Sequence, residues 1–127
     1  DYTGSMFAAG AGGGSVINQM VESSEEFIQD LPAAYRVALM EYHDRDQSSR
    51  LIHNFSTQRD SLVQSLNAFS VPFGQNGASQ VYDAVIEACE RLDDEDINTL
   101  PFDDTDLRAV IFISDGRDTS SEASLAE

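Results

Sequence analysis

The chain begins with oxygen-bearing side chains at alternate positions. Asp1, Thr3 and Ser5 offer one carboxylate and two hydroxyls, and Gly4 gives the backbone between the hydroxyls the freedom to curl. Mixed oxygen ligands with few carboxylates suit a hard divalent cation such as Mg²⁺, which keeps several of its waters. Taken alone, this spacing is more common in turns and helix caps. A metal site would therefore need further ligands elsewhere in the sequence.

Two later positions could supply these partners. A Ser-Asp-Gly sequence centred on Asp115 ends the apolar run at 110–113, which places a carboxylate at the carboxyl end of a predicted strand. A Gly-Ala-Ser sequence that ends at Ser79 opens a predicted helix from a loop. Each residue alone is explained as a turn residue or an N-cap. Together, and in this order, the three groups predict one cation site.

The predicted helices follow from the spacing of apolar residues. From 16 to 31 they return every three to four positions, and Pro32 ends the pattern. The same spacing predicts helices at 60–69 and from 79 to 92. Cys89 lies within the apolar pattern of the last helix, so we expect it to be a buried packing residue.

The predicted strands lie at 33–43, 50–55 and 107–113. The first is a mostly apolar run bounded by polar residues, and the second places Leu51, His53 and Phe55 on one face and Ile52 on the other. The last has four consecutive apolar residues at 110–113 and predicts a strand that is buried on both faces. The resulting order is helix, strand, strand, helix, helix, strand. This order is typical of an α/β fold in which helices cover both faces of a mainly parallel sheet. In such sheets ligands bind at the carboxyl ends of the strands.

These motifs, in this order, resemble the von Willebrand factor type A family. The metal-ion-dependent adhesion site of that family has an Asp-x-Ser-x-Ser motif after the first strand, a Thr before a later helix and an Asp after the fourth strand. Asp1, Thr3 and Ser5 match the first motif, with Thr in place of the middle Ser. Ser79 keeps the hydroxyl of the family's Thr, and Asp115 matches the last Asp. The resemblance runs essentially from end to end.

The resemblance implies a Rossmann-like three-layer sandwich, of which 1–127 would be one partial domain. The family's first strand would precede residue 1, and its closing elements would follow residue 127. The neighbouring domains of a larger parent chain would then be among its partners. The family's adhesive members also imply a place at the cell surface or outside the cell.

The function implied by the resemblance is cation-dependent protein binding without catalysis. Hydroxyls at Thr3, Ser5 and Ser79 would hold Mg²⁺, or Mn²⁺ or Ca²⁺, while Asp1 and Asp115 would act partly through bridging waters. A cation with so few direct anionic ligands accepts a carboxylate from a partner protein. Specificity would come from the loops at 7–14, 44–49 and 71–78. The residues expected beside the metal are Tyr2, Gly4, Met6, Gly77, Ala78 and Gly116.

The charge of the chain excludes several partners. Asp and Glu number 23 against 7 basic residues, all of them arginine, for a net charge of -16. A field of this sign repels nucleic acid and anionic membrane surfaces. No apolar run approaches the roughly 20 residues that span a bilayer, so direct membrane insertion is not expected. The charge favours cations, a basic partner or simply a solvated acidic surface.

Other kinds of site fit less well. The Asp-Thr-Gly-Ser motif of aspartic proteases is interrupted here by Tyr2. Those enzymes also have a nearly all-β fold, which the predicted helices do not fit. The glycine-rich run at 7–14 is not followed by the Lys of a phosphate-binding loop. A Ser/His/Asp triad could use His43 or His53, but each is better explained as an ordinary strand histidine. The acidic connector at 93–106 lacks the spacing of a calcium loop.

One alternative from the same family remains. The metal site could be weak or vestigial, and the chain could serve as a structural or assembly subunit of an enzyme complex such as a chelatase-type ATPase system. A parent sequence with an adjoining ATPase would favour this alternative, whereas adhesive or repeat modules would favour protein binding.

Overall fold

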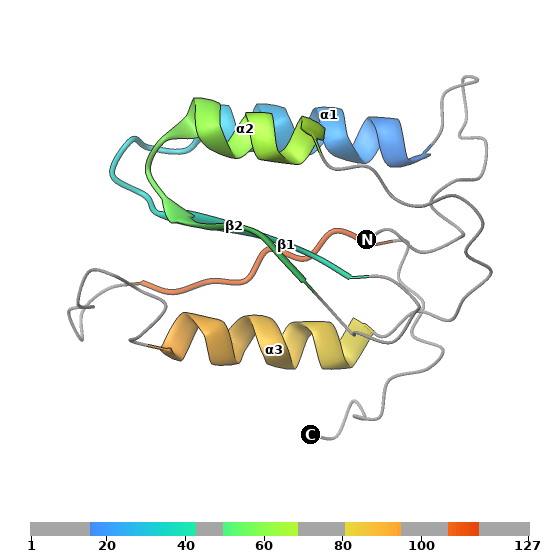
Figure 1. The fold of residues 1–127 in the computed structure, drawn as a ribbon, viewed down its shortest axis with the longest axis vertical. Helices are drawn as coiled ribbons and strands as arrows, with labels where there is room; N and C mark the ends of the chain where they lie inside the picture. Colours follow the sequence, from blue (N-terminus) through green and yellow to red (C-terminus); the bar gives the residue numbers. More distant parts are fainter. Residues whose placement is uncertain (1–15, 43–49, 69–80, 95–106, 115–127) are drawn as a thin grey trace.

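The computed structural model describes residues 16–42, 50–68, 81–94 and 107–114. Within these ranges the chain forms the elements α1 (Val16–Asp30), β1 (Val37–Glu41), β2 (Arg50–Ser56), α2 (Arg59–Ala68) and α3 (Val81–Asp93). Figure 1 shows α1 and α2 side by side on one face of the strands, and α3 on the other face. The helices and the first two strands therefore confirm the predicted elements, with shifted ends.

The two strands pair antiparallel, with Val37 opposite Ser56 and Glu41 opposite Arg50. The predicted Rossmann-like sandwich with a mainly parallel sheet is therefore wrong. The described residues form a small α+β unit with a two-stranded antiparallel sheet and three helices. The physical reason is the short connection at 42–49, because parallel neighbours need a crossover of about a dozen residues or more.

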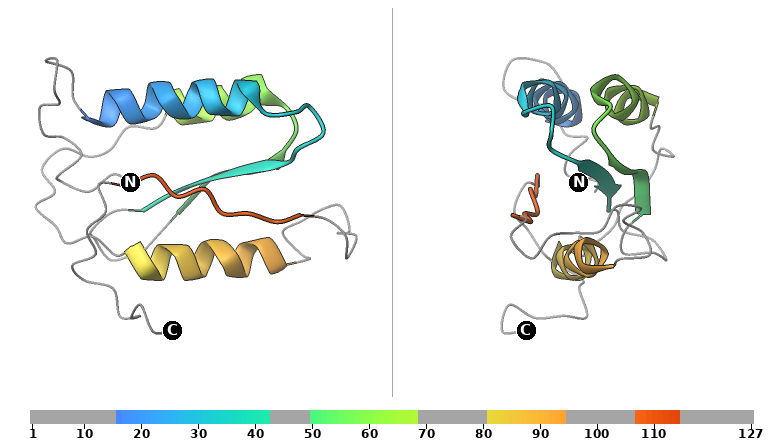
Figure 2. Two further views of the ribbon diagram at one scale, coloured as in Figure 1. Left: turned by 180° about the vertical axis from the view of Figure 1, so that it is seen from behind. Right: turned by 90° about the vertical axis from the view of Figure 1, so that its left-hand side faces the viewer.

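The predicted strand at 107–113 is also wrong. This stretch runs as an extended chain in the same direction as β1, but it pairs with no described strand. Figure 2 shows it beside β1, on the side away from β2. The stretch is not buried on both faces, since Leu107 is 93% exposed and Ile111 is 63% exposed. A continuous apolar run becomes a buried strand only where neighbouring chains cover it.

β1 begins four positions later than predicted, because a turn takes up the start of the apolar run. The backbone N–H of Tyr35 donates to the carbonyl of Pro32 at 3.0 Å and closes this turn. The guanidinium of Arg59 donates to the same Pro32 carbonyl at 2.7 Å and to that of Tyr35 at 2.8 Å. The first residue of α2 thus holds the chain where it enters β1.

The main apolar core lies between α1, α2 and the sheet. Ile28 from α1 packs with Leu62 and Leu66 from α2, and Leu62 has no exposed surface. Half-buried residues of both helices and of β1 surround them, namely Val21, Val37, Leu39 and Val63. A second cluster of Ile17 and Met20 lies near the start of α1. The i, i+3, i+4 spacing read from the sequence accounts for these faces.

α3 is less buried than the other two helices. Ala84 is its one buried residue, while Ile86 and Cys89 are exposed. The prediction that Cys89 is a buried packing residue is therefore wrong. An ion pair between Arg108 and Asp93 joins the end of α3 to the extended stretch. Within the described ranges, no helix has both the length and the apolar character needed to cross a membrane.

Candidate functional site

All the predicted ligands of the cation lie outside the described residues. The same is true of the residues expected beside the metal and of the loops at 7–14, 44–49 and 71–78. The predicted ligands in question are Asp1, Thr3, Ser5, Ser79 and Asp115, and their expected neighbours are Tyr2, Gly4, Met6, Gly77, Ala78 and Gly116. Their geometry therefore stays a prediction, and the evidence comes from the described residues next to them.

These adjoining residues lie at one end of the molecule. α1 begins at Val16, directly after the segment 1–15, and α3 begins at Val81, two positions after Ser79. The extended stretch ends at Ser114, directly before Asp115. In Figure 1 the starts of α1 and α3 and the end of the extended stretch are all at the right-hand side, where β1 also ends. The reverse view in Figure 2 agrees.

The helix dipoles at this end determine how much negative charge a bound cation would require from its ligands. The first turns of α1 and α3 carry the positive ends of their helix dipoles. This field disfavours a bare cation, so carboxylates must offset it. Asp83 lies in the first turn of α3, whereas α1 has no acidic residue in its first turn. The two carboxylates of the predicted site, Asp1 and Asp115, would supply the remaining negative charge.

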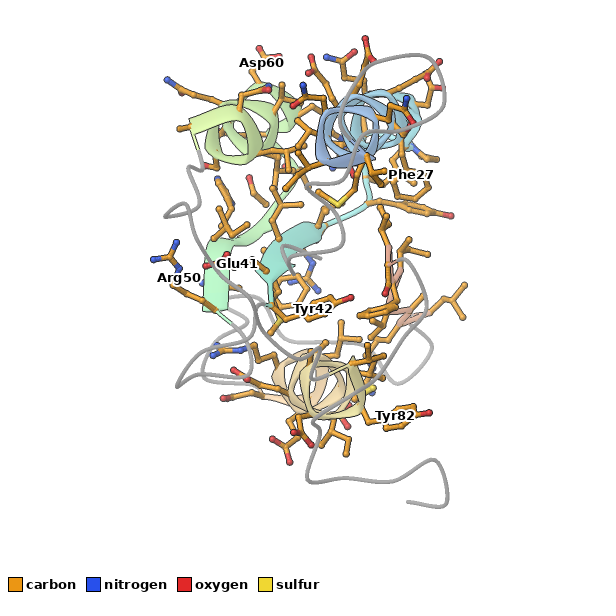
Figure 3. The ribbon with its side chains drawn as sticks, turned by 90° about the vertical axis from the view of Figure 1, so that its right-hand side faces the viewer. Phe27, Glu41, Tyr42, Arg50, Asp60 and Tyr82 are labelled. Atoms are coloured by element: carbon orange, nitrogen blue, oxygen red, sulfur yellow. The ribbon has the colours of Figure 1, made fainter. Side chains whose placement is uncertain are left out.

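An aromatic stack connects the two chains that end here. The buried ring of Tyr42, next after β1, stacks on Phe112 with ring centroids 5.1 Å apart and planes 20° from parallel. Figure 3 shows Tyr42 pointing from β1 toward the extended stretch. Such a pair contributes about 0.5–1.5 kcal/mol beyond its buried area. The stack therefore helps to fix where the chain emerges at Ser114.

An ion pair between a buried Glu and an exposed Arg lies where β1 ends and β2 begins. The Glu41 side chain is 1% exposed, and its Oε1 is 2.7 Å from Nε of Arg50, which is 57% exposed (Figure 3). The register places the two residues directly opposite one another. Sequence analysis missed this pair, although an acid closing an apolar run and an Arg opening the next one could have indicated it. Among the described residues, no group of three or more His, Cys, Asp or Glu could hold a metal.

His53 makes two hydrogen bonds that define its role. Nδ1 lies 2.6 Å from the carbonyl oxygen of Asn54, and Nε2 lies 2.8 Å from the hydroxyl of Ser61. A carbonyl can only accept, so Nδ1 carries the proton, and in the neutral ring Nε2 accepts from the Ser61 hydroxyl. A backbone carbonyl takes the place that a carboxylate has in a Ser/His/Asp triad. Among the described residues this pair thus links β2 to α2, while His43 lies outside them.

Comparisons with known proteins give no information on the function of this chain. Protein-family models, curated proteins and solved structures were each searched, and none matches the chain. The resemblance to the von Willebrand factor type A family therefore rests on the motif residues and stays a prediction.

Proposed function

We propose that the chain is a protein-binding module that depends on a divalent cation and performs no catalysis. Mg²⁺, Mn²⁺ or Ca²⁺ would be held by Asp1, Thr3, Ser5, Ser79 and Asp115 and would accept a carboxylate from a partner protein. One observation carries this proposal. The described segments next to all three groups of ligands reach the same end of the molecule (Figure 1).

The charge of the chain explains why a cation is needed. At a net charge of -16, the protein repels an acidic partner at long range. A divalent cation held mainly by hydroxyls and waters keeps most of its own charge, so it attracts the partner's carboxylate at short range. The cation would thus turn a repulsive surface into a specific acceptor of acidic side chains.

The first experiment measures thermal unfolding of the 127-residue chain with Mg²⁺ or Mn²⁺, compared with NaCl at the same ionic strength. The salt control is needed because screening alone reduces repulsion within an acidic protein. Metal at about ten times its dissociation constant should stabilise the native chain by about 1.4 kcal/mol through mass action. We expect this shift for the native sequence and its near loss in Asp115→Asn.

Asp30→Asn is the matched control. Asp30 is the exposed last residue of α1, and α1 ends at the opposite end of the molecule from the starts of α1 and α3 (Figure 1). The substitution removes the same charge, so Asp30→Asn should keep the full metal-dependent shift. If Asp115→Asn keeps it as well, the cation is bound elsewhere or only by the general field, and the proposal is wrong.

A further inference from the structure

Tyr42 is held in place by the end of the sheet. It follows Glu41, the last residue of β1, whose Oε1 lies 2.7 Å from Nε of Arg50 on the paired strand. Tyr42 itself is buried, with 5% of its surface exposed. A buried aromatic side chain has few alternative rotamers, because the neighbouring atoms occupy the space that those rotamers would need. The ring of Tyr42 is therefore a fixed surface against which another part of the chain can be positioned.

Phe112 is the residue that uses this surface. Its ring centroid lies 5.1 Å from that of Tyr42, and Figure 3 shows Tyr42 directed toward the extended stretch. Phe112 precedes Ser114 by two positions and Asp115 by three. Because a chain spans at most about 3.6 Å per residue, the Cα atoms of Phe112 and Asp115 are within roughly 11 Å of each other. The stack thereby limits the positions that the Asp115 carboxylate can reach.

The ion pair at the other end of the stretch is the weaker contact. Arg108 pairs with Asp93 at the end of α3, but the two side chains are 36% and 76% exposed. Pairs in such contact with solvent contribute little, and salt weakens them further. In Figure 1 the stretch begins beside the end of α3 and runs toward the start of that helix. The stack is thus the stronger of these two contacts and the one nearer the starts of α1 and α3.

We propose that Tyr42 is a positioning residue for the cation site, because its stack with Phe112 holds the chain that leads to Asp115 at the end where α1 and α3 begin. The inference rests on the proposed function, since the stack would act on the metal affinity. The apparent affinity for a ligand falls with the fraction of molecules whose binding groups are already in place. The energy of an aromatic stack corresponds to a change of roughly 2- to 10-fold in that affinity.

The test measures the Mn²⁺ dissociation constant of the 127-residue chain from the electron paramagnetic resonance signal of the free ion. Phe112→Leu keeps an apolar residue but removes the ring, so it should weaken binding roughly 2- to 10-fold. Phe112→Tyr keeps the ring and should bind Mn²⁺ as the native chain does. Ile111→Ala is the matched control, because it removes apolar surface from the preceding residue, which is 63% exposed. It should also keep the native affinity.

Two further measurements separate positioning from a general loss of structure. Tyr42→Phe and Tyr42→Leu repeat the comparison from the other side of the stack, and far-UV circular dichroism establishes which variants are folded. The second measurement needs no metal. In EDTA, the heteronuclear NOE of the Ser114 amide reports its motion on the picosecond to nanosecond timescale. This NOE should fall in Phe112→Leu and stay at the native value in Ile111→Ala.

The outcomes distinguish this inference from the proposed function. If Asp115→Asn weakens Mn²⁺ binding but Phe112→Leu keeps the native affinity, the inference is wrong and the proposed function stands. An equal loss of affinity in Phe112→Leu and Ile111→Ala would also overturn the inference, because the ring would then have no special role. If Asp115→Asn binds Mn²⁺ as tightly as the native chain, the proposed function is wrong and the inference fails with it.

Discussion

Two leucines of this chain have opposite surroundings. Leu62 has no exposed surface and contacts apolar side chains of α1, α2 and the sheet, whereas Leu107 is 93% exposed. The same residue type therefore contributes very differently to the free energy of unfolding. The sequence indicated Leu62 correctly, because it lies in a repeating helical pattern. It failed at Leu107 and Cys89, because an apolar pattern shows which face could be buried but not whether a neighbour covers it.

Leu62→Ala should lower the free energy of unfolding by about 2–5 kcal/mol, since it removes buried methyl groups and leaves a cavity. Leu107→Ala makes the same chemical deletion on the surface and should change it by less than about 0.5 kcal/mol. Urea unfolding followed by circular dichroism measures both. Similar costs for the two variants would mean that the core between α1, α2 and the sheet is not where we place it.

At the scale of elements, the sequence predicted the features that depend on local pattern and missed those that depend on tertiary contacts. α1, α2 and α3 were predictable because their apolar residues repeat every three to four positions. β1 was predictable as part of a mostly apolar run, and β2 from the apolar residues that it places on both faces. The start of β1 was not predictable from composition, since it depends on hydrogen bonds between the Pro32–Tyr35 turn and distant Arg59. The strand predicted at 107–113 was wrong, because an apolar run forms a strand only where a neighbouring strand pairs with it, and the run itself does not specify that neighbour.

Arg59→Met tests the link between α2 and the entry to β1. Met keeps much of the side-chain volume but loses the donors to two carbonyls, so we expect a loss of about 1–2 kcal/mol. The amide of Tyr35 should also exchange faster with solvent. Arg91→Met is the control, because Arg91 pairs with Glu87 four positions earlier on α3, and such a pair contributes about 0.5 kcal/mol or less. Equal costs would contradict the proposed role of Arg59.

At the scale of the whole molecule, the described part of the chain brings together the ends of segments that are far apart in sequence. The starts of α1 and α3 and the end of 107–114 reach one end of the structure, where the Tyr42–Phe112 stack connects β1 to the extended stretch. The sequence predicted that Asp1, Ser79 and Asp115 would belong to one site. It could not supply the distances between them, because these depend on how the three segments pack.

Paramagnetic broadening by Mn²⁺ tests the proposed cation site most directly. NMR spectra of the isotope-labelled chain are recorded as sub-stoichiometric Mn²⁺ is added, for the native sequence and for Asp115→Asn. We expect the signals of the first turns of α1 and α3 and of the residues leading to Ser114 to broaden first. The ends of α1 and α3 at Asp30 and Asp93 should stay sharp, and Asp115→Asn should remove the selective effect. Uniform broadening, or selective broadening near Asp30 or Asp93, would contradict the account.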